Sequence, residues 1–148
     1  MPEVPMLREG DRMPDFVWED TLSAFRGKPM ILYFYPADLT PGCTMEAKAF
    51  NDRYDAFREA GYEVIGISVD NDEKHDEFRS ECGLRFPLVA DDGAELTRSL
   101  GLLKQYGDYG WFAARVTYLL DAEGVVQRVW DVEDAGGHPE EVLAAVQG

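Results

Sequence analysis

The sequence predicts an α/β fold in which helices flank a mixed central sheet. Apolar runs of strand length alternate with amphipathic helical segments, and a hairpin pattern follows near the C-terminus. The 148 residues suit one domain, so we expect residues 1–148 to surround a single sheet. A strand, a helix and a second strand form a right-handed crossover, so the first two long strands should be parallel.

The first third of the chain predicts a buried strand and a long helix. Residues 15–20 and 22–25 could pair as a small hairpin, and the continuous apolar run 30–35 is typical of a strand buried on both faces. A helix should begin after Thr40, a good N-cap residue, and end at Gly61. Its apolar residues recur at three- and four-residue steps and should form one buried face: Cys43, Ala47, Phe50, Tyr54 and Phe57.

The remaining elements follow from turn residues and hydrophobic spacing. In chain order we expect a strand at 62–70, a helix at 72–82 ended by Gly83, a strand at 86–91, a helix at 93–102, a Gly- and aromatic-rich loop at 103–114, a hairpin at 115–132 and a helix from about His138.

Composition excludes several classes of function. The formal net charge is −15, which disfavours binding to nucleic acids or anionic membranes. The first residues lack the apolar segment of a secretory signal, and two cysteines are too few for a disulfide scaffold. His75 and His138 lie far apart among charged residues, so we expect them at the surface rather than in a metal site. These observations predict a cytoplasmic protein with reduced thiols and no cofactor.

Cys43 occupies an unusual position for a core cysteine, in the first turn of the helix after Thr40. Backbone N–H groups and the helix dipole favour negative charge there, and the thiolate is the nucleophilic form of cysteine. The dipole contributes only about 0.3–1 kcal/mol, less than one pKa unit, so activation needs a cation from elsewhere in the fold. On position alone, Cys43 could equally be the first apolar residue of the buried helix face.

The residues around Cys43 carry a more specific pattern. The stretch PADLTPGCT contains Pro-x-x-x-Thr-x-x-Cys, which resembles the peroxidatic motif of peroxiredoxins. The context FRGKPMILYFYPADLTPGCTMEAKAF, with GISVD, FPLVADD and RVTYLLD, resembles the peroxiredoxin Q or bacterioferritin comigratory protein group from about Leu7 to about Val146. The resemblance implies a thioredoxin-like fold and a thiol-dependent peroxidase that reduces hydrogen peroxide and organic hydroperoxides.

The resemblance also assigns roles to five residues. Cys43 matches the peroxidatic cysteine, Thr40 and Pro36 the motif threonine and proline, Arg115 the family arginine, and Glu46 a glutamate that helps to hold this arginine. Arg115 would supply the required cation and donate to the peroxide oxygens, while Thr40 would accept from the peroxide. Pro36 would keep water out of the pocket. Singly, Pro36 and Glu46 could be ordinary structural residues, but the combination favours a site.

Cys82 leaves two interpretations open. Many members of the group carry a resolving cysteine five residues after the peroxidatic one, where this chain has Lys48, and others carry it in the following helix. Either Cys82 resolves the Cys43 sulfenic acid as an intramolecular disulfide, or Cys82 is structural and an external thiol completes a one-cysteine cycle. We expect the disulfide. It needs Cα atoms within about 7 Å, and therefore local unwinding after Thr40 or between Glu77 and Cys82.

Two other thiol functions make different predictions. A dithiol oxidoreductase would need a second cysteine three residues after Cys43, where this chain has Glu46. A redox sensor would react once, whereas a peroxidase would consume many equivalents of peroxide. The implied partners are a peroxide and thioredoxin or a similar dithiol, and the resemblance favours a monomer.

Overall fold

The computed structural model describes residues 6–13 and 27–147. The hairpin predicted within residues 15–25 lies outside this part of the chain. The elements, in order, are β1 (Met30–Phe34), α1 (Pro41–Asp52), α2 (Tyr54–Glu59), β2 (Glu63–Ser68), α3 (Asp72–Cys82), β3 (Leu88–Ala90), α4 (Glu95–Ser99), β4 (Leu103–Gln105), the 3₁₀ turn η2 (Gly107–Tyr109), β5 (Trp111–Ala113), β6 (Val116–Leu120), β7 (Val126–Asp131) and α5 (His138–Gln147).

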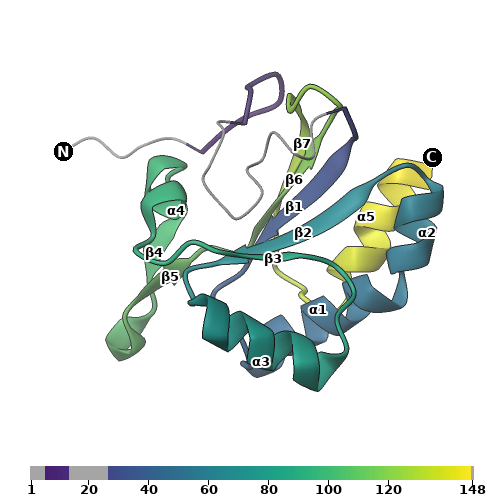
Figure 1. Cartoon of the computed structure of the whole chain (residues 1–148). Helices are drawn as coiled ribbons and strands as arrows, with labels where there is room; N and C mark the ends of the chain where they lie inside the picture. The colour runs from purple at the N-terminus through teal and green to yellow at the C-terminus, as the bar shows by residue number, and fades with distance from the viewer. Residues whose placement is uncertain (1–5, 14–26, 148) are drawn as a thin grey trace.

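A five-stranded sheet in the order β3-β2-β1-β6-β7 forms the centre of the structure (Figure 1). β1 pairs in parallel with β2 and antiparallel with β6, so the predicted mixed α/β sheet and the parallel first crossover are confirmed. The pairing of Phe34 with Val116 places the end of β1 beside the start of β6. The loop that leads to Cys43 and the residue before β6, Arg115, therefore meet at one edge of the sheet.

The central strand β1 is buried on both faces, as its continuous apolar run predicts. Ile31 and Tyr33 pack in a core with side chains from α1, α2, α3 and α5. Leu32 and Phe34 point to the other face, where Leu96 belongs to the same cluster. Four helices therefore cover the Cys43 face of the sheet and α4 covers the opposite face.

The long helix predicted between Thr40 and Gly61 is divided. It breaks at Arg53, whose backbone φ of −105° and ψ of 5° leave the helical range, and α2 continues beyond it. The predicted buried face nevertheless stays continuous across the break, and all five of its members are buried: Cys43, Ala47, Phe50, Tyr54 and Phe57. Thr40 occupies the N-cap position, but its side chain makes no capping hydrogen bond.

Two further expectations differ from the structure. Residues 103–114 are not an irregular loop, because β4 and β5 pair as an antiparallel hairpin with Leu103 opposite Ala113. The predicted helix 93–102 is shorter, since Ala94 adopts a left-handed φ of 59° and Leu100 leaves the helix. Helix α3 has the predicted bounds, and Gly83 ends it with a left-handed φ of 61°. Within the described residues, none of the helices combines the length and apolar character that crossing a bilayer requires.

Candidate active site

Cys43 lies in the first turn of α1, and its thiol faces the guanidinium of Arg115. Arg115 Nη2 donates to Cys43 Sγ at 3.3 Å, and Arg115 Nη1 donates to Glu46 Oε1 at 2.6 Å. The Cys43 residue is 1% exposed and Glu46 is fully buried. One guanidinium thus bridges two side chains of the same helix turn, and it supplies the positive charge that the dipole alone cannot.

Burial and neighbouring charges shift the pKa values of Glu46 and Arg115 beside the thiol. Burial raises the pKa of Glu46 to about 7, although the positive charge of Arg115 opposes this shift. Burial alone would lower the pKa of Arg115, but the charges of Glu46 and Cys43 outweigh it and the pKa lies above its ordinary value. Arg115 therefore stays charged beside the sulfur throughout the physiological pH range.

Backbone shape at the start of α1 lets the guanidinium approach the thiol. A Cβ atom added to Gly42 would lie 3.2 Å from Arg115 Nη2, closer than most such contacts. Thr40 is exposed, and its hydroxyl donates to the carbonyl of Ala37 at 2.8 Å, which leaves the oxygen lone pairs free to accept. Pro36 is half-buried in the same loop. The five predicted residues thus lie in one loop and helix turn, or contact it.

Two tyrosines lie close enough to sense the site's charges. Burial, then the negative charges of Glu46 and Cys43, raise the pKa of Tyr33 well above its ordinary value. Neither the Tyr33 hydroxyl nor Glu46 Oε2 has a hydrogen-bond partner within the described residues. Burial also raises the pKa of Tyr106, in the β4–β5 hairpin, with opposing effects from Arg115 and Cys43. The Tyr106 hydroxyl donates at 3.1 Å to the carbonyl of Ala113, two residues before Arg115, so the hairpin borders the site.

Cys82 lies away from Cys43, beside the later turns of α1. Asn51 Nδ2 donates to the carbonyl of Gly83 at 3.1 Å, and the N–H of Arg85 donates to Asn51 Oδ1 at 2.9 Å. Asn51 follows Cys43 by eight residues, a rise of about 12 Å along a helix. Burial raises the pKa of Cys82, and the positive charge of Lys48 opposes this shift. Both cysteines are free thiols in this structure.

The two histidines are buried, which corrects their expected surface position. His138 Nε2 lies 2.8 Å from Thr117 Oγ1, and His75 Nδ1 lies 2.6 Å from Asp38 Oδ2. Burial lowers the pKa of His138 despite the charge of Glu141. The charged sequence neighbours belong to the exposed sides of α3 and α5. The three-residue spacing of His75 and Phe78, both buried on α3, is the signal in the sequence that indicates this burial.

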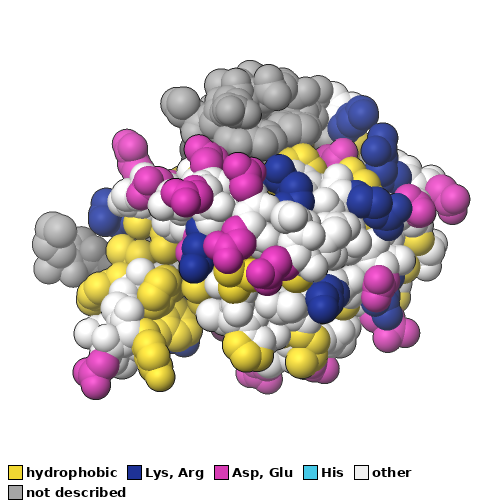
Figure 2. Space-filling model, turned by 60° about the horizontal axis from the view of Figure 1, so that its bottom comes forward, with side chains coloured by type: hydrophobic (Ala, Val, Ile, Leu, Met, Phe, Trp, Pro, Cys, Tyr) yellow, Lys and Arg dark blue, Asp and Glu magenta, His cyan; other side chains and the backbone are white. Residues whose placement is uncertain are grey.

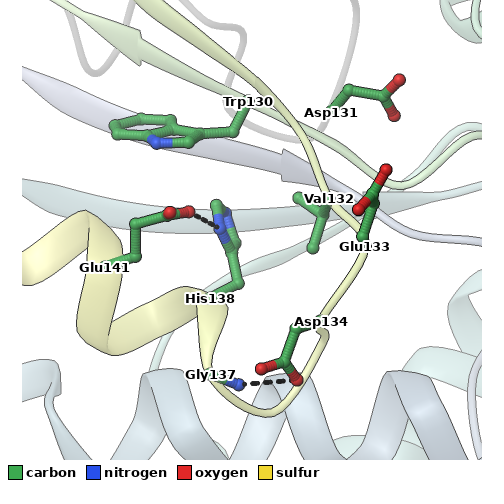
Figure 3. A pocket seen from close by; sticks show the side chains of 8 residues that line it. All are labelled: Trp130, Asp131, Val132, Glu133, Asp134, Gly137, His138 and Glu141. Carbon is green, nitrogen blue, oxygen red and sulfur yellow. Dashed lines mark hydrogen bonds and ion pairs between the residues drawn. The ribbon is translucent and has the colours of Figure 1, made fainter.

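A pocket of about 330 Å³ lies between the end of β7 and the start of α5, and His138 belongs to its lining. Figure 3 shows Trp130 and His138 on its wall, with Glu141 contacting the imidazole and Asp134 accepting from the N–H of Gly137. Its lining includes none of the five predicted residues. The pocket therefore lies beside the Cys43 site and not in it, since the N–H of Val132 in its lining donates to the carbonyl of Arg115 at 2.9 Å.

Comparisons with known proteins agree with this geometry. The AhpC/TSA family model matches residues 10–129. Chloroplastic peroxiredoxin Q of Sedum lineare is 40% identical over 148 residues, which cover 95% of this chain and 78% of the relative. The chain spans 59% of the length of the rice relative of the same name, from Oryza sativa subsp. japonica.

Solved structures lead to the same group. The bacterioferritin comigratory protein of Xanthomonas campestris, whose structures address its alkyl peroxide reduction activity, is 39% identical with a TM-score of 0.78, covering 86% of this chain and 83% of that one. A mutant PrxQ of Xylella fastidiosa is 31% identical with a TM-score of 0.86, covering 95% and 96%. These neighbours confirm the thioredoxin-like fold. The chain belongs to the AhpC/TSA family and is a peroxiredoxin, most similar among these relatives to the peroxiredoxin Q group.

Proposed function

We propose that this chain is a thiol-dependent peroxidase that reduces hydrogen peroxide and organic hydroperoxides through Cys43. The observation that carries the proposal is the bridge from Arg115 to both the Cys43 sulfur and the buried Glu46 carboxylate. A fixed cation beside a buried thiol favours the thiolate, and the same guanidinium can donate to peroxide oxygens as negative charge develops on them.

The proposed reaction begins when the Cys43 thiolate attacks the terminal oxygen of the peroxide. The O–O bond breaks, the sulfur is oxidised to sulfenic acid, and the leaving oxygen takes a proton to depart as water or an alcohol. Thr40 can accept from the peroxide hydroxyl, since its own hydrogen is used by Ala37. The N–H groups at the start of α1 add a positive field at the same place.

Resolution of the sulfenic acid is proposed to use Cys82. The Cys82 sulfur attacks the Cys43 sulfur, a disulfide forms and water leaves. Thioredoxin or a similar dithiol then reduces the disulfide by exchange and is itself oxidised. Hydrogen bonds hold the end of α3 against the later turns of α1, away from Cys43. Cys82 can therefore reach Cys43 only if one of the two helices unwinds locally during this step.

The acceptance of organic hydroperoxides is supported by the surface beside the site. Figure 2 shows apolar side chains gathered over the β4–β5 hairpin, where Tyr109 is 88% and Trp111 57% exposed. Tyr106 of the same hairpin is close enough to Cys43 and Arg115 to sense their charges. An apolar wall beside the thiol would accommodate the organic group of a hydroperoxide. A cytoplasmic location and a monomeric state stay predictions.

Intact-mass measurement tests the proposal directly. Reduced protein is mixed with one equivalent of hydrogen peroxide and then alkylated. Loss of two hydrogen atoms, with both thiols protected from alkylation, is the expected result, and the Cys82→Ser variant should instead gain one oxygen at Cys43. The same gain in the unaltered protein, with Cys82 still alkylated, would indicate a one-cysteine peroxidase.

Turnover separates an enzyme from a sensor. With thioredoxin, its reductase and NADPH present, a peroxidase consumes many equivalents of peroxide per chain, and the Cys43→Ser variant consumes none. A single equivalent consumed by the unaltered chain would favour a sensor. An absence of reaction with any peroxide would contradict the proposal.

A further inference from the structure

A buried ion pair joins the loop that carries the peroxidatic motif to helix α3. Asp38, in this loop, is 3% exposed, and His75, on α3, is 1% exposed. His75 Nδ1 lies 2.6 Å from Asp38 Oδ2, and the Tyr35 hydroxyl donates to Asp38 Oδ1 at 2.6 Å. His75 Nε2 lies 3.0 Å from the carbonyl of Val89 on β3. The pair thus connects the loop, α3, β3 and Tyr35, the residue that follows β1.

The contacts of His75 specify its charge. When Asp38 is ionised, its carboxylate and the Val89 carbonyl can only accept, so both ring nitrogens donate and the imidazole carries both protons. Burial lowers the pKa of His75, but the hydrogen bond and charge of Asp38, the Val89 carbonyl and the charge of Asp70 outweigh it, and the pKa is raised. The Tyr35 oxygen, 3.5 Å from Nδ1, also faces the ring.

Asp38, Asp70 and His75 form a cluster whose residue types could in principle bind a metal ion. Ligand atoms of Asp38, Asp70 and His75 lie within 4.8 Å of one another. Because both His75 nitrogens donate to other groups, neither offers a lone pair to the space between the carboxylates. The cluster is therefore best described as a hydrogen-bonded ion pair.

Asp38 is fixed through its backbone as well as its side chain. Its N–H donates to Asp70 Oδ2 at 2.8 Å, and Ser68 Oγ donates to the same oxygen at 2.6 Å. The next residue, Leu39, has a left-handed φ of 64°, which is unfavourable for a leucine, and Thr40 follows it. The hydrogen bonds of Asp38 hold the chain just before Leu39, and the left-handed turn at Leu39 leads it into the first turn of α1.

We propose that the Asp38–His75 pair is a latch that positions the Cys43 loop for reaction with peroxide and must open before Cys43 and Cys82 can join. The inference rests on the proposed peroxidase function. His75 and Cys82 belong to the same helix, so one contact holds both the segment that carries Cys43 and the segment that carries Cys82. Opening the latch frees both at once.

The latch has a defined response to pH. His75 binds its proton more tightly in the folded protein than in the unlatched chain, so the latch is complete at low pH and weakens as the pH rises through the raised pKa of His75. The latch should therefore be closed at pH values below the raised pKa of His75.

The His75→Gln variant tests the latch, because glutamine keeps a donor but loses the charge. We expect about a tenfold lower second-order rate of Cys43 oxidation by hydrogen peroxide, together with about a tenfold higher first-order rate of disulfide formation, as expected for the coupling energy of a contacting pair. The two rates separate in a stopped-flow experiment with acid quench and alkylation. A parallel fall of both rates would overturn the latch.

The Leu100→Ala variant is the matched control. Leu100 is buried in the core on the opposite face of the sheet, so its truncation destabilises the fold without touching the latch. Even if Leu100→Ala loses as much stability against urea as His75→Gln does, it should leave the rate of disulfide formation unchanged. Asp38→Asn combined with His75→Gln should behave no worse than either single change, because both variants remove one shared contact.

Hydrogen exchange gives a test that uses the unaltered reduced protein. After correction for intrinsic exchange, protection of residues 37–46 and 72–82 should fall together as the pH rises through the pKa of His75, while residues 96–102 stay protected. Nitrogen NMR should show both His75 nitrogens protonated on the acidic side of this pKa. Independence of these two segments from each other and from pH would overturn the latch, even if the peroxidase activity holds.

The two proposals can fail separately. If Cys82 forms no disulfide, the resolution step is wrong, but the paired hydrogen exchange and the slower oxidation of His75→Gln still test the latch. If peroxide does not react with Cys43 at all, the peroxidase function fails, whatever the exchange experiment shows.

Discussion

Arg115 and Cys43 are separated by 72 residues, and the guanidinium of the first donates to the sulfur of the second at 3.3 Å. The pairing of β1 with β6 brings them together, because it places the residue before β6 at the end of β1 from which the loop to α1 departs. Glu46, one helical turn after Cys43, holds the other side of the guanidinium. The cation is therefore fixed by the sheet and by the same helix that presents the thiol.

Replacing Arg115 with lysine should reduce the rate of Cys43 oxidation by ~10²–10³-fold, the cost of removing one preorganised donor to a developing charge. Lysine keeps the charge, but its single ammonium group lacks the planar fork that reaches both Glu46 and Cys43. Stopped-flow oxidation by hydrogen peroxide measures the rate. Circular dichroism and urea unfolding should show a folded variant, and an unchanged rate would mean that Arg115 does not stabilise the reacting groups.

Gly42→Ala should separate activity from stability. The new Cβ would lie 3.2 Å from Arg115 Nη2 and displace the guanidinium from the sulfur, so we expect oxidation of Cys43 to slow by about tenfold. Alanine is better than glycine inside a helix by roughly 0.5–1 kcal/mol, so the free energy of unfolding should not fall. Peroxide kinetics and urea unfolding of the same preparation test both halves. A slower variant that is also much less stable would point to damage of the helix instead.

Glu46→Gln should flatten the dependence of stability on pH. Burial raises the pKa of Glu46 to about 7, above the value of 4.5 in the unfolded chain, so the folded protein binds this proton more tightly. Its contribution to stability is present below about pH 4.5 and is lost as the pH rises through about 7. At about 1.36 kcal/mol per pKa unit, the rise of the pKa from 4.5 to about 7 corresponds to roughly 3 kcal/mol.

Urea unfolding of the two proteins at pH 5 and pH 8 checks this prediction. Glutamine cannot ionise, so the variant should lose less stability between these pH values than the unaltered chain. The difference in slope is the informative quantity, because loss of the Arg115 partner shifts the variant at both pH values. Equal slopes would place the pKa of Glu46 near its ordinary value.

Elements with local signals at both ends were predicted well from the sequence. Helix α3 begins at Asp72, after Asn71, whose side chain accepts from the N–H of Lys74, and it ends at Gly83 in the left-handed conformation that favours glycine. The break at Arg53 and the three-residue strands β4 and β5 have no comparable signal, since short strands depend on their partner for stability. Local chemistry determined the first case and tertiary pairing the second.

The candidate site shows the same division. Cys43 and Thr40 could be located by the helix start that they share, but the contact of Arg115 with Glu46 spans 69 residues and only the resemblance to a family indicated it. The charged neighbours of His75 favoured an exposed position. The spacing of His75 and Phe78 was a local signal for a buried face of α3, but the Asp38 partner lies 37 residues earlier and no local pattern specifies that contact.

The contact between α1 and the end of α3 should control how fast the disulfide forms. Asn51 donates to the carbonyl of Gly83, next to Cys82, and accepts from the N–H of Arg85. Asn51→Ala removes both bonds, at a cost of about 1 kcal/mol of stability each. The end of α3 would then separate from α1 more often, so the first-order formation of the Cys43–Cys82 disulfide should accelerate by about fivefold. Oxidation of Cys43 by peroxide should keep its rate, because Asn51 contacts neither Cys43 nor Arg115.

The control for this last change is Ser99→Ala, which removes the hydrogen bond from Ser99 Oγ to Leu96 on the opposite face of the sheet. It removes one hydrogen bond where Asn51→Ala removes two, so it should cost at most about half as much stability, and it should leave the rate of disulfide formation unchanged. Acid quench and alkylation at successive times after peroxide addition follow the Cys82 thiol in both variants. Acceleration in Ser99→Ala as well would mean that general loosening of the fold is sufficient. A slower disulfide in Asn51→Ala would instead mean that the contact guides Cys82 toward Cys43, with unwinding confined to the first turn of α1.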